Sequence, residues 1–464
     1  MKLKYVIYIF LTGVFFSCSI GKNYQRPNLD LPGTFRNNAL VEMEKDTVIH
    51  PPHGFFRNIG LLALLDTAFL RNSDLLVAVK NIESAAWSLK AAKLDFFPEI
   101  NARLNGTYNR ASENSAIGQT GQELSSEDYN LSAALTWDVD IWGKIRRGKE
   151  EAVSNYLQTS EARKAVQTKL VFDIAQGYYN LLMLDEQLDI AVRSRELTDS
   201  TLFIVRLQYE VNDANLLGIK QIEAQLQQNN LLISQIEQSI FAQENALSLL
   251  CGNYAGHIER SWDKEDEFHK IPPEGYPASV LIARPDIRAA ELALRAANAR
   301  VGIAQASMFP ALNISLTGGL NSLTTSDWFS TPASLFGTVA GGLVQPVFNR
   351  GRLKANYEQA KIEREKAVVN FRQKVLEGYS QVSDALQNRM ENENQYTFAL
   401  KREEALEEGV RSANIMFKAG VANYLDVISV QSNYLQARLE TTRLYTNKAL
   451  SNVEVYYSLG GGWE

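Results

Sequence analysis

Histidine and cysteine, which commonly bind metal ions and perform acid–base or nucleophilic catalysis, are rare in this 464-residue chain. It has four histidines and two cysteines, and two of the histidines form the motif His50-Pro51-Pro52-His53. Two prolines between the histidines and no neighbouring cysteine favour a surface linker over a metal site, so we expect neither a metal nor a cofactor. The sequence also lacks a P-loop, an HExxH motif, a G-x-S-x-G motif and a dinucleotide-binding glycine pattern. We therefore predict no catalytic residues, and Cys251 is expected to be a small core residue.

Cys18 is the residue for which covalent chemistry is predicted. Two lysines precede an uncharged stretch, Tyr5 to Phe16, which is too short for a membrane-spanning helix but typical of a signal peptide. The following Ser17-Cys18 resembles a bacterial lipoprotein processing site, where the cysteine becomes the lipidated N-terminus. We predict a signal peptide over residues 1–17 and a lipidated, extended segment over residues 18–55. The alternative is an ordinary secretory signal with an incidental cysteine.

The charge balance excludes one class of partner. Lysines and arginines number 47 and acidic residues 53, which gives a net charge of −6. A nucleic-acid-binding protein needs a basic face to neutralise phosphates, so we expect no nucleic acid. After the signal peptide no run approaches 18 apolar residues, and we therefore expect any membrane crossing to be made by β-strands.

The chain contains an internal repeat. Phe97-Pro98 recurs in the second half as Phe309-Pro310. Further pairs recur at one constant spacing that is slightly shorter: Gly143-Lys144-Ile145-Arg146 with Gly351-Arg352-Leu353-Lys354, Ala214-Asn215-Leu216-Leu217 with Ala422-Asn423-Tyr424-Leu425, and Leu250-Cys251-Gly252 with Ser458-Leu459-Gly460. The order of these pairs predicts two structural repeats of one organisation, over residues 56–270 and 271–464.

Long helices are predicted where proline is missing. No proline lies between Pro98 and Pro272, and none follows Pro346. The residues from Gly143 to Asn212 are mostly good helix formers, and about 70 residues at 1.5 Å each form a rod of roughly 100 Å. After a turn, apolar residues recur at heptad spacing: Ile219, Ile222, Leu226, Ile233, Ile236, Ile240, Leu247 and Leu250. This pattern predicts antiparallel coiled-coil hairpins.

Three segments alternate between apolar and polar residues, as β-strands in a membrane do: Ile100–Asn109, Tyr129–Ile141 and Leu312–Thr317. A fourth strand is predicted over Leu335–Val347, where Gly337, Gly341 and Gly342 blur the alternation and leave the register open. The polar side of the first two segments supplies candidate lumen-facing residues: Asn101, Arg103, Asn105, Asp138 and Asp140. For Asp138 and Asp140, a solvated position without a lumenal role is an equal alternative. The segments Glu113–Asp128 and Asn321–Pro332 are predicted to be polar loops.

Four strands from one chain cannot close a barrel, and hydrocarbon does not tolerate open sheet edges. Two chains would give eight strands with a filled interior, whereas three chains would give twelve strands and a lumen. The predicted fold class is therefore mainly α with membrane β-strands. It is internally duplicated, with four strands per chain in a 12-stranded trimeric barrel and long coiled-coil helices in a hollow α-barrel, which the resemblance described next places in the periplasm.

Several short sequence fragments follow one another along the chain in a characteristic order. They are Asn23-Tyr24-Gln25-Arg26-Pro27, Phe97-Pro98, Asp140-Ile141-Trp142-Gly143-Lys144, Phe309-Pro310, Gln345-Pro346-Val347-Phe348 and Phe417-Lys418-Ala419-Gly420-Val421. In this order the sequence resembles the TolC-like outer-membrane efflux family, in particular its NodT-type lipoprotein branch. The resemblance implies a homotrimeric duct in the outer membrane, lipid-anchored and extending into the periplasm. It also implies outer-membrane lipids, a periplasmic adaptor (membrane-fusion) protein and a proton-driven inner-membrane pump as partners.

The resemblance further implies that two turns form the periplasmic tip, where family members constrict and adaptors dock. The candidates are Asn212, Asp213, Asn215, Asn423, Tyr424, Leu425, Asp426 and Ser429. For Asp426, a gating role and an ordinary first-turn acid favoured by the helix dipole remain equal alternatives. The expected function is export of small toxic solutes, drugs or metal ions, and the alternative is a duct for ABC-type polypeptide secretion. A cytoplasmic coiled-coil scaffold would explain neither the signal peptide nor the alternating strands.

Overall fold

The computed structural model describes residues 20–36, 51–117, 119, 123–212, 214–261, 268–269 and 276–463. Cys18, Asp213 and His50 therefore lie outside the described residues. The chain divides into two compact units. The first comprises Met1–Pro27, Ile82–Gln158 and Ala290–Phe371, and the second comprises Asn28–Asn81, Thr159–Ala289 and Arg372–Glu464.

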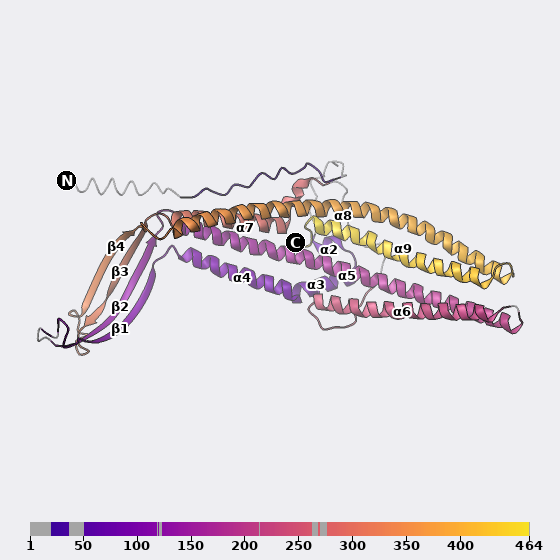
Figure 1. Ribbon diagram of the computed structural model, residues 1–464, viewed down its shortest axis with the longest axis horizontal. Coiled ribbons are helices and arrows are strands. Elements are labelled where there is room, and N and C mark those ends of the chain that lie inside the picture. Colours follow the sequence, from indigo (N-terminus) through magenta and orange to yellow (C-terminus); the bar gives the residue numbers. More distant parts are fainter. Residues whose placement is uncertain are drawn as a thin grey trace. The chain divides into compact units, whose positions relative to one another are not determined.

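The elements of the first half of the chain are helices that flank one pair of strands (Figure 1). In order they are α2 (Pro52–Phe55), α3 (Ile59–Arg71), α4 (Ser73–Leu94), β1 (Glu99–Arg110), β2 (Ser125–Val139), α5 (Lys144–Glu210) and α6 (Leu216–Leu250). The second half has the 3₁₀ helix η2 (Ala278–Ala283), α7 (Pro285–Ala306), β3 (Ala311–Ser322), β4 (Leu335–Val344), α8 (Arg352–Lys418) and α9 (Tyr424–Ser458).

Corresponding helices of the two halves have equal lengths. Helices α4 and α7 have 22 residues each, α5 and α8 have 67 each, and α6 and α9 have 35 each. Positive backbone φ angles also recur at corresponding positions of the two halves, at Gly143 and Gly351, at Asn212 and Gly420, and at Gly252 and Gly460. Because left-handed backbone marks the sharp turns at helix ends, the same turns are built twice. The predicted duplication and the long helical hairpins are thus confirmed.

In the first unit, the four strands form one antiparallel sheet in the order β1-β2-β3-β4. Strand β2 begins at Ser125, inside the segment expected to be a loop, because Ser125–Asp128 pair with Thr107–Arg110 of β1 through backbone bonds that need no apolar side chains. Strand β3 continues to Ser322, beyond its predicted end. Strand β4 ends at Val344 rather than Val347, where Pro346 has no N–H for the ladder.

In the second unit, the main core lies where α3 and the connector after α6 pack on α5, α6 and α9. Its largest fully buried side chains include Phe56, Leu61, Ile174, Tyr178 and Leu247. Cys251 belongs to this core, and burial raises the pKa of its thiol to about 11. A thiol with such a pKa is protonated at neutral pH, which agrees with its predicted structural role.

Within the part of the chain that the structure describes, no helix combines the length and the apolar character needed to cross a bilayer.

Candidate functional site: a two-faced sheet and the hairpin turns

One face of the sheet is apolar across all four strands. The strand register places Ile100, Leu135, Leu316 and Val339 in one row, and Leu104, Leu131, Leu320 and Leu335 in another. Most of these side chains are exposed in the single chain, and Val339 retains 76% of its accessible surface. A row of exposed leucine, isoleucine and valine requires an apolar environment, which is either another protein surface or lipid.

The opposite face is polar. Asn101, Arg103 and Asn105 lie on it together with Asp138, because successive side chains of a strand alternate between faces. The register continues two of these rows as Arg103–Ser132–Gly319–Phe336 and Asn105–Asn130–Asn321. The four predicted lumen candidates within strands therefore share one face.

Asp140, the fifth candidate, lies beyond the end of β2. Its carboxylate accepts hydrogen bonds from the backbone N–H groups of Ile145 at 2.9 Å and Arg146 at 3.0 Å, and the Arg146 side chain approaches it at 3.2 Å. An acid in this place satisfies unpaired N–H groups at the start of α5. Asp140 thus fastens the helix to the strand.

Each hairpin in the second unit turns through an asparagine cap. The Asn215 side chain accepts a hydrogen bond from Gly218 N at 2.9 Å at the start of α6. In the equivalent place before α9, Asn423 accepts from Leu425 N at 2.8 Å and Asp426 N at 3.1 Å, while Asp426 accepts from Asn423 N at 3.0 Å. This reciprocal pair is a capping box, so Asp426 has a structural role that does not depend on gating.

The ends of the four long helices share a small apolar core. It contains Leu202 and Val205 of α5, Ile219 and Ile222 of α6, Phe417 of α8 and Val427 of α9. Two polar contacts on α5 lie close to it: Thr198 accepts from Asn229 at 3.0 Å, and Thr201 accepts from Gln431 at 3.4 Å. A polar pair inside a coiled-coil seam fixes the register of the helices, which supports an ordered tip.

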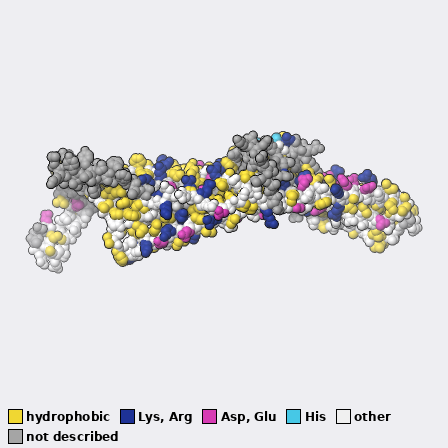
Figure 2. Space-filling model, turned by 90° about the horizontal axis from the view of Figure 1, so that it is seen from above, with side chains coloured by type: hydrophobic (Ala, Val, Ile, Leu, Met, Phe, Trp, Pro, Cys, Tyr) yellow, Lys and Arg dark blue, Asp and Glu magenta, His cyan; other side chains and the backbone are white. Residues whose placement is uncertain are grey.

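The predicted tip residues differ in their surroundings. The Tyr424 ring lies against Gly218, where an added Cβ would be 2.7 Å from the ring carbon Cζ. Leu425 remains 47% exposed, and Ser429 is exposed as well. Figure 2 shows mostly hydrophobic and uncharged side chains at the end that carries these turns, where Val211 and Val421 are also exposed. Gly218 was missed by sequence reasoning, because nothing local marks the contact with Tyr424.

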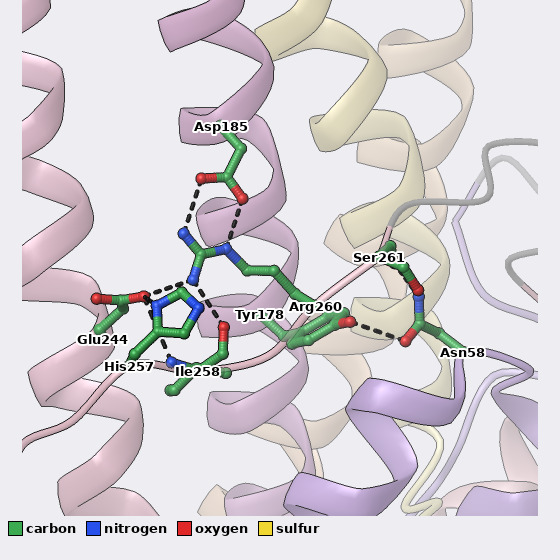
Figure 3. A network of polar contacts seen from close by, with 8 residues as sticks. All are labelled: Asn58, Tyr178, Asp185, Glu244, His257, Ile258, Arg260 and Ser261. Atoms are coloured by element: carbon green, nitrogen blue, oxygen red, sulfur yellow. Dashed lines mark hydrogen bonds and ion pairs between the residues drawn. The ribbon is translucent and has the colours of Figure 1, made fainter.

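A partly buried ion network in the second unit holds the connector after α6 (Figure 3). The Arg260 guanidinium donates to Asp185 of α5 and to Glu244 of α6, with an Nη2–Oδ1 distance of 2.8 Å to Asp185. Glu244 also accepts from His257 Nδ1 at 2.8 Å and from the Ile258 N–H at 3.4 Å. Burial alone would raise the pKa of Glu244, but hydrogen bonds from Arg260 and Ile258 outweigh it and lower the pKa.

The N-terminal segment of the first unit is tied to α5 and α7. The buried Arg147 donates to Gly21 O and to Asn23 Oδ1, both at 3.0 Å. Arg26 forms a bidentate ion pair with Glu291 at 2.6 and 2.7 Å. The Ile20 N–H donates to Trp142 O at 3.3 Å, just after the end of β2. The described segment therefore begins at the end of the sheet where β2 leads into α5, which is called the base of the sheet below.

Comparison with known proteins decides the family. The family model for outer membrane efflux proteins matches residues 64–253 and again 276–461. The chain belongs to the outer membrane efflux protein family. Its two matching segments each contain one long hairpin and one pair of strands, so the family unit itself occurs twice here.

Several named proteins are similar to this chain over nearly the full length of both sequences. The cation efflux system protein CusC of Escherichia coli O6:H1 is 27% identical over 100% of this chain and 98% of its own length. The probable outer membrane lipoprotein SilC of Salmonella typhimurium is 28% identical over 96% of this chain and 95% of its own length. The open-state outer membrane channel MtrE of Neisseria gonorrhoeae superposes with a TM-score of 0.85 at 25% identity, covering 96% of this chain and 99% of MtrE.

Proposed function

We propose that three copies of this chain form a passive duct through the outer membrane. The four strands of each copy contribute to a 12-stranded barrel, and the hairpins α5–α6 and α8–α9 form a helical barrel in the periplasm. The duct receives small toxic solutes, drugs or metal ions, from a proton-driven inner-membrane pump through a periplasmic adaptor protein.

The two-faced sheet carries this proposal. Its apolar face spans every strand, its opposite face is polar, and within the described residues the outer edges of β1 and β4 have no strand partner. In hydrocarbon an unpaired edge costs several kcal/mol for each unsatisfied backbone group. Pairing β4 of one copy with β1 of the next removes both edges, and three copies leave a water-filled lumen lined by the polar face.

We place the lipid anchor at Cys18. Ile20 is hydrogen-bonded to the backbone at the end of β2, so an acyl group two residues earlier would enter the membrane beside the base of the sheet. The lipoprotein named among the relatives, SilC, supports this assignment. The boundaries 1–17, 18–55, 56–270 and 271–464 remain our proposed division of the chain.

The hairpin turns are our proposed gate and adaptor-docking end. Leu425 is exposed beside the capping box of Asn423 and Asp426, and we assign it to the constriction. Asn212, Asp213, Asn215, Tyr424 and Ser429 complete the proposed tip. Exposed apolar side chains at this end support docking to another protein.

The relative named for cation efflux supports small solutes over polypeptides as cargo. The assembly is tested by native mass spectrometry of the detergent-extracted protein and by conductance in planar bilayers. We expect a trimer mass and discrete ion-conducting steps, whereas a non-conducting monomer would overturn the proposal. Deleting the gene should sensitise cells to transition metals or small toxic compounds, while unchanged susceptibility with lost secretion of a protein would favour the polypeptide duct.

A further inference from the structure

A basic groove lies in the first unit at the base of the sheet. Its volume is about 390 Å³, and it is formed by Phe96 after α4, by α5 and by Arg295 of α7. Its cationic residues are Arg146, Lys149 and Arg295, and its apolar residues include Phe96, Val153 and Leu157. A groove of this size with both kinds of lining is typical of a ligand site.

The charge of the groove is positive. Its one carboxylate, Glu150, is already paired with Arg147 at 2.6 Å. Among the described residues, no carboxylate lies within ion-pair distance of Lys149 or Arg295. Arg295 instead lies over the Tyr24 ring, 5.4 Å from its centre. Arg295 acts electrostatically on Glu291 without forming an ion pair with it, so two cations that no described carboxylate contacts lie at the edge of one cavity and favour an anionic ligand.

The groove continues the apolar face of the sheet. Trp137 lies on that face, in register with Ile314, and its indole N–H donates to Phe96 O at 3.0 Å. Phe96 precedes the edge strand β1, whereas α5 and α7, which supply the cations, adjoin the middle strands β2 and β3. The apolar face of the sheet therefore leads through Trp137 and Phe96 to the groove that holds the cations.

We propose that this groove binds the phosphate headgroup of an anionic phospholipid from the periplasmic leaflet. Lys149 and Arg295 bind the phosphate oxygens beside Arg146, whose side chain also pairs with Asp140 at 3.2 Å, while Phe96 and Val153 contact the apolar part next to the headgroup. Arginine and lysine at the end of a membrane-spanning element are suited to this role, because phosphates are concentrated there. The proposal rests on the proposed membrane position of the sheet, and it adds a lipid-binding site to the duct.

The test uses the delipidated full-length protein in detergent. Phosphatidylglycerol or phosphatidylcholine is titrated, and bound lipid is counted by native mass spectrometry. The variant K149Q/R295Q removes the two unpaired cations, and the variant K149R keeps the charge. The control R352Q/K354Q removes one arginine and one lysine from exposed positions at the start of α8, close in sequence to the end of β4.

We expect wild-type protein to bind phosphatidylglycerol at least fivefold more tightly than phosphatidylcholine. K149Q/R295Q should lose this preference, while K149R and the control double variant keep it. Equal loss in the control would indicate unspecific surface attraction and overturn the site. Displacement of bound phosphatidylglycerol by an equal concentration of inorganic phosphate would assign the groove to free phosphate and overturn the proposal of a lipid ligand. Pore conductance, measured on the same variants, should be unchanged, so the proposed duct and the lipid site fail independently.

Discussion

Asn72 and Arg284 perform the same task in the two halves of the chain with different side chains. Asn72 Nδ2 donates to Leu250 O at 2.8 Å, and Arg284 Nη1 donates to Ser458 O at 2.6 Å. The two acceptors are the last residues of α6 and α9, which are corresponding helices of the two repeats. Each donor thus satisfies a carbonyl in the last turn of a helix, where the helix itself provides no backbone N–H partner.

Arg284→Ala should destabilise the protein more than Asn72→Ala. Arg284 is 4% exposed and also donates to Asp286 and Gln381, so its loss leaves three acceptors without a charged donor. We expect a cost on the order of 3 kcal/mol for Arg284→Ala and about 1–2 kcal/mol for Asn72→Ala. Guanidinium unfolding at fixed protein concentration measures both. Arg372→Ala, at an exposed position of α8, is the control and should change stability by less than about 0.5 kcal/mol.

Gly218→Ala should loosen the hairpin tip. The new methyl group would be 2.7 Å from Tyr424 Cζ, so the ring must move and the contact between α6 and α9 must open. We expect a loss of about 1–3 kcal/mol, which Tyr424→Ala in the same chain largely relieves. Gly148→Ala is the matched control, since no atom lies within 4 Å of its added Cβ and alanine favours a helix. An equal effect in the presence and absence of the Tyr424 ring would refute the contact.

The sequence predicts what depends on local backbone and on the repeat. The turns at Asn215 and Asn423 follow from the aligned Ala214-Asn215 and Ala422-Asn423, and the structure shows that both asparagines cap the next helix, a local contact between residues three positions apart. The contact of Gly218 with Tyr424 could not be predicted in this way. It depends on the register between helices from different halves of the chain, which is set by packing in the small tip core.

The same limit applies to charged residues. Arg260 follows α6 in a segment without regular structure, and nothing in its neighbourhood indicates that it reaches Asp185 of α5. Asp140 was a candidate for the lumen or for plain solvent exposure, because its position continues the alternation of β2. Strand alternation stops at Val139, and the backbone N–H groups of α5 then determine where the carboxylate lies.

Glu244→Gln should lower stability at neutral pH but not at acid pH. The folded state lowers the pKa of Glu244 below its ordinary value of 4.5, so folding disfavours its protonation. Its contribution is therefore complete above pH 4.5 and is lost as the pH falls through the folded-state pKa. We expect a deficit of about 2 kcal/mol at pH 7.5 that shrinks below pH 4.5.

Thermal melts of wild type and Glu244→Gln across this pH range measure the deficit. Glu237→Gln, on an exposed part of the same helix, should match wild type throughout. A deficit that stays constant down to pH 3 would show that packing, and not the charge of Glu244, holds Arg260.

Cys18→Ala should abolish lipid attachment and leave the trimer intact. The acyl chains anchor the N-terminus, whereas the proposed barrel is held in the membrane by its own apolar face. Labelling with a radioactive fatty acid should mark wild type and not the variant, and native mass spectrometry should find trimers in both. Labelling of the variant would place the modification elsewhere and overturn the assignment of Cys18.

Ala102 and Arg103 are neighbours on β1 that belong to opposite faces of the sheet, and they test the proposed membrane position most directly. Ala102 pairs with Ala133 on the apolar face, so Ala102→Arg puts a charge into lipid at a cost of about 2–4 kcal/mol per copy near the bilayer centre. Arg103 pairs with Ser132 on the polar face, so Arg103→Glu leaves insertion unchanged and makes the lumen more negative. Outer-membrane fractionation should show depletion of the first variant only. For Arg103→Glu, the reversal potential in a salt gradient should shift towards cation selectivity. Depletion of Arg103→Glu together with normal insertion of Ala102→Arg would show that the polar face, and not the apolar face, contacts lipid.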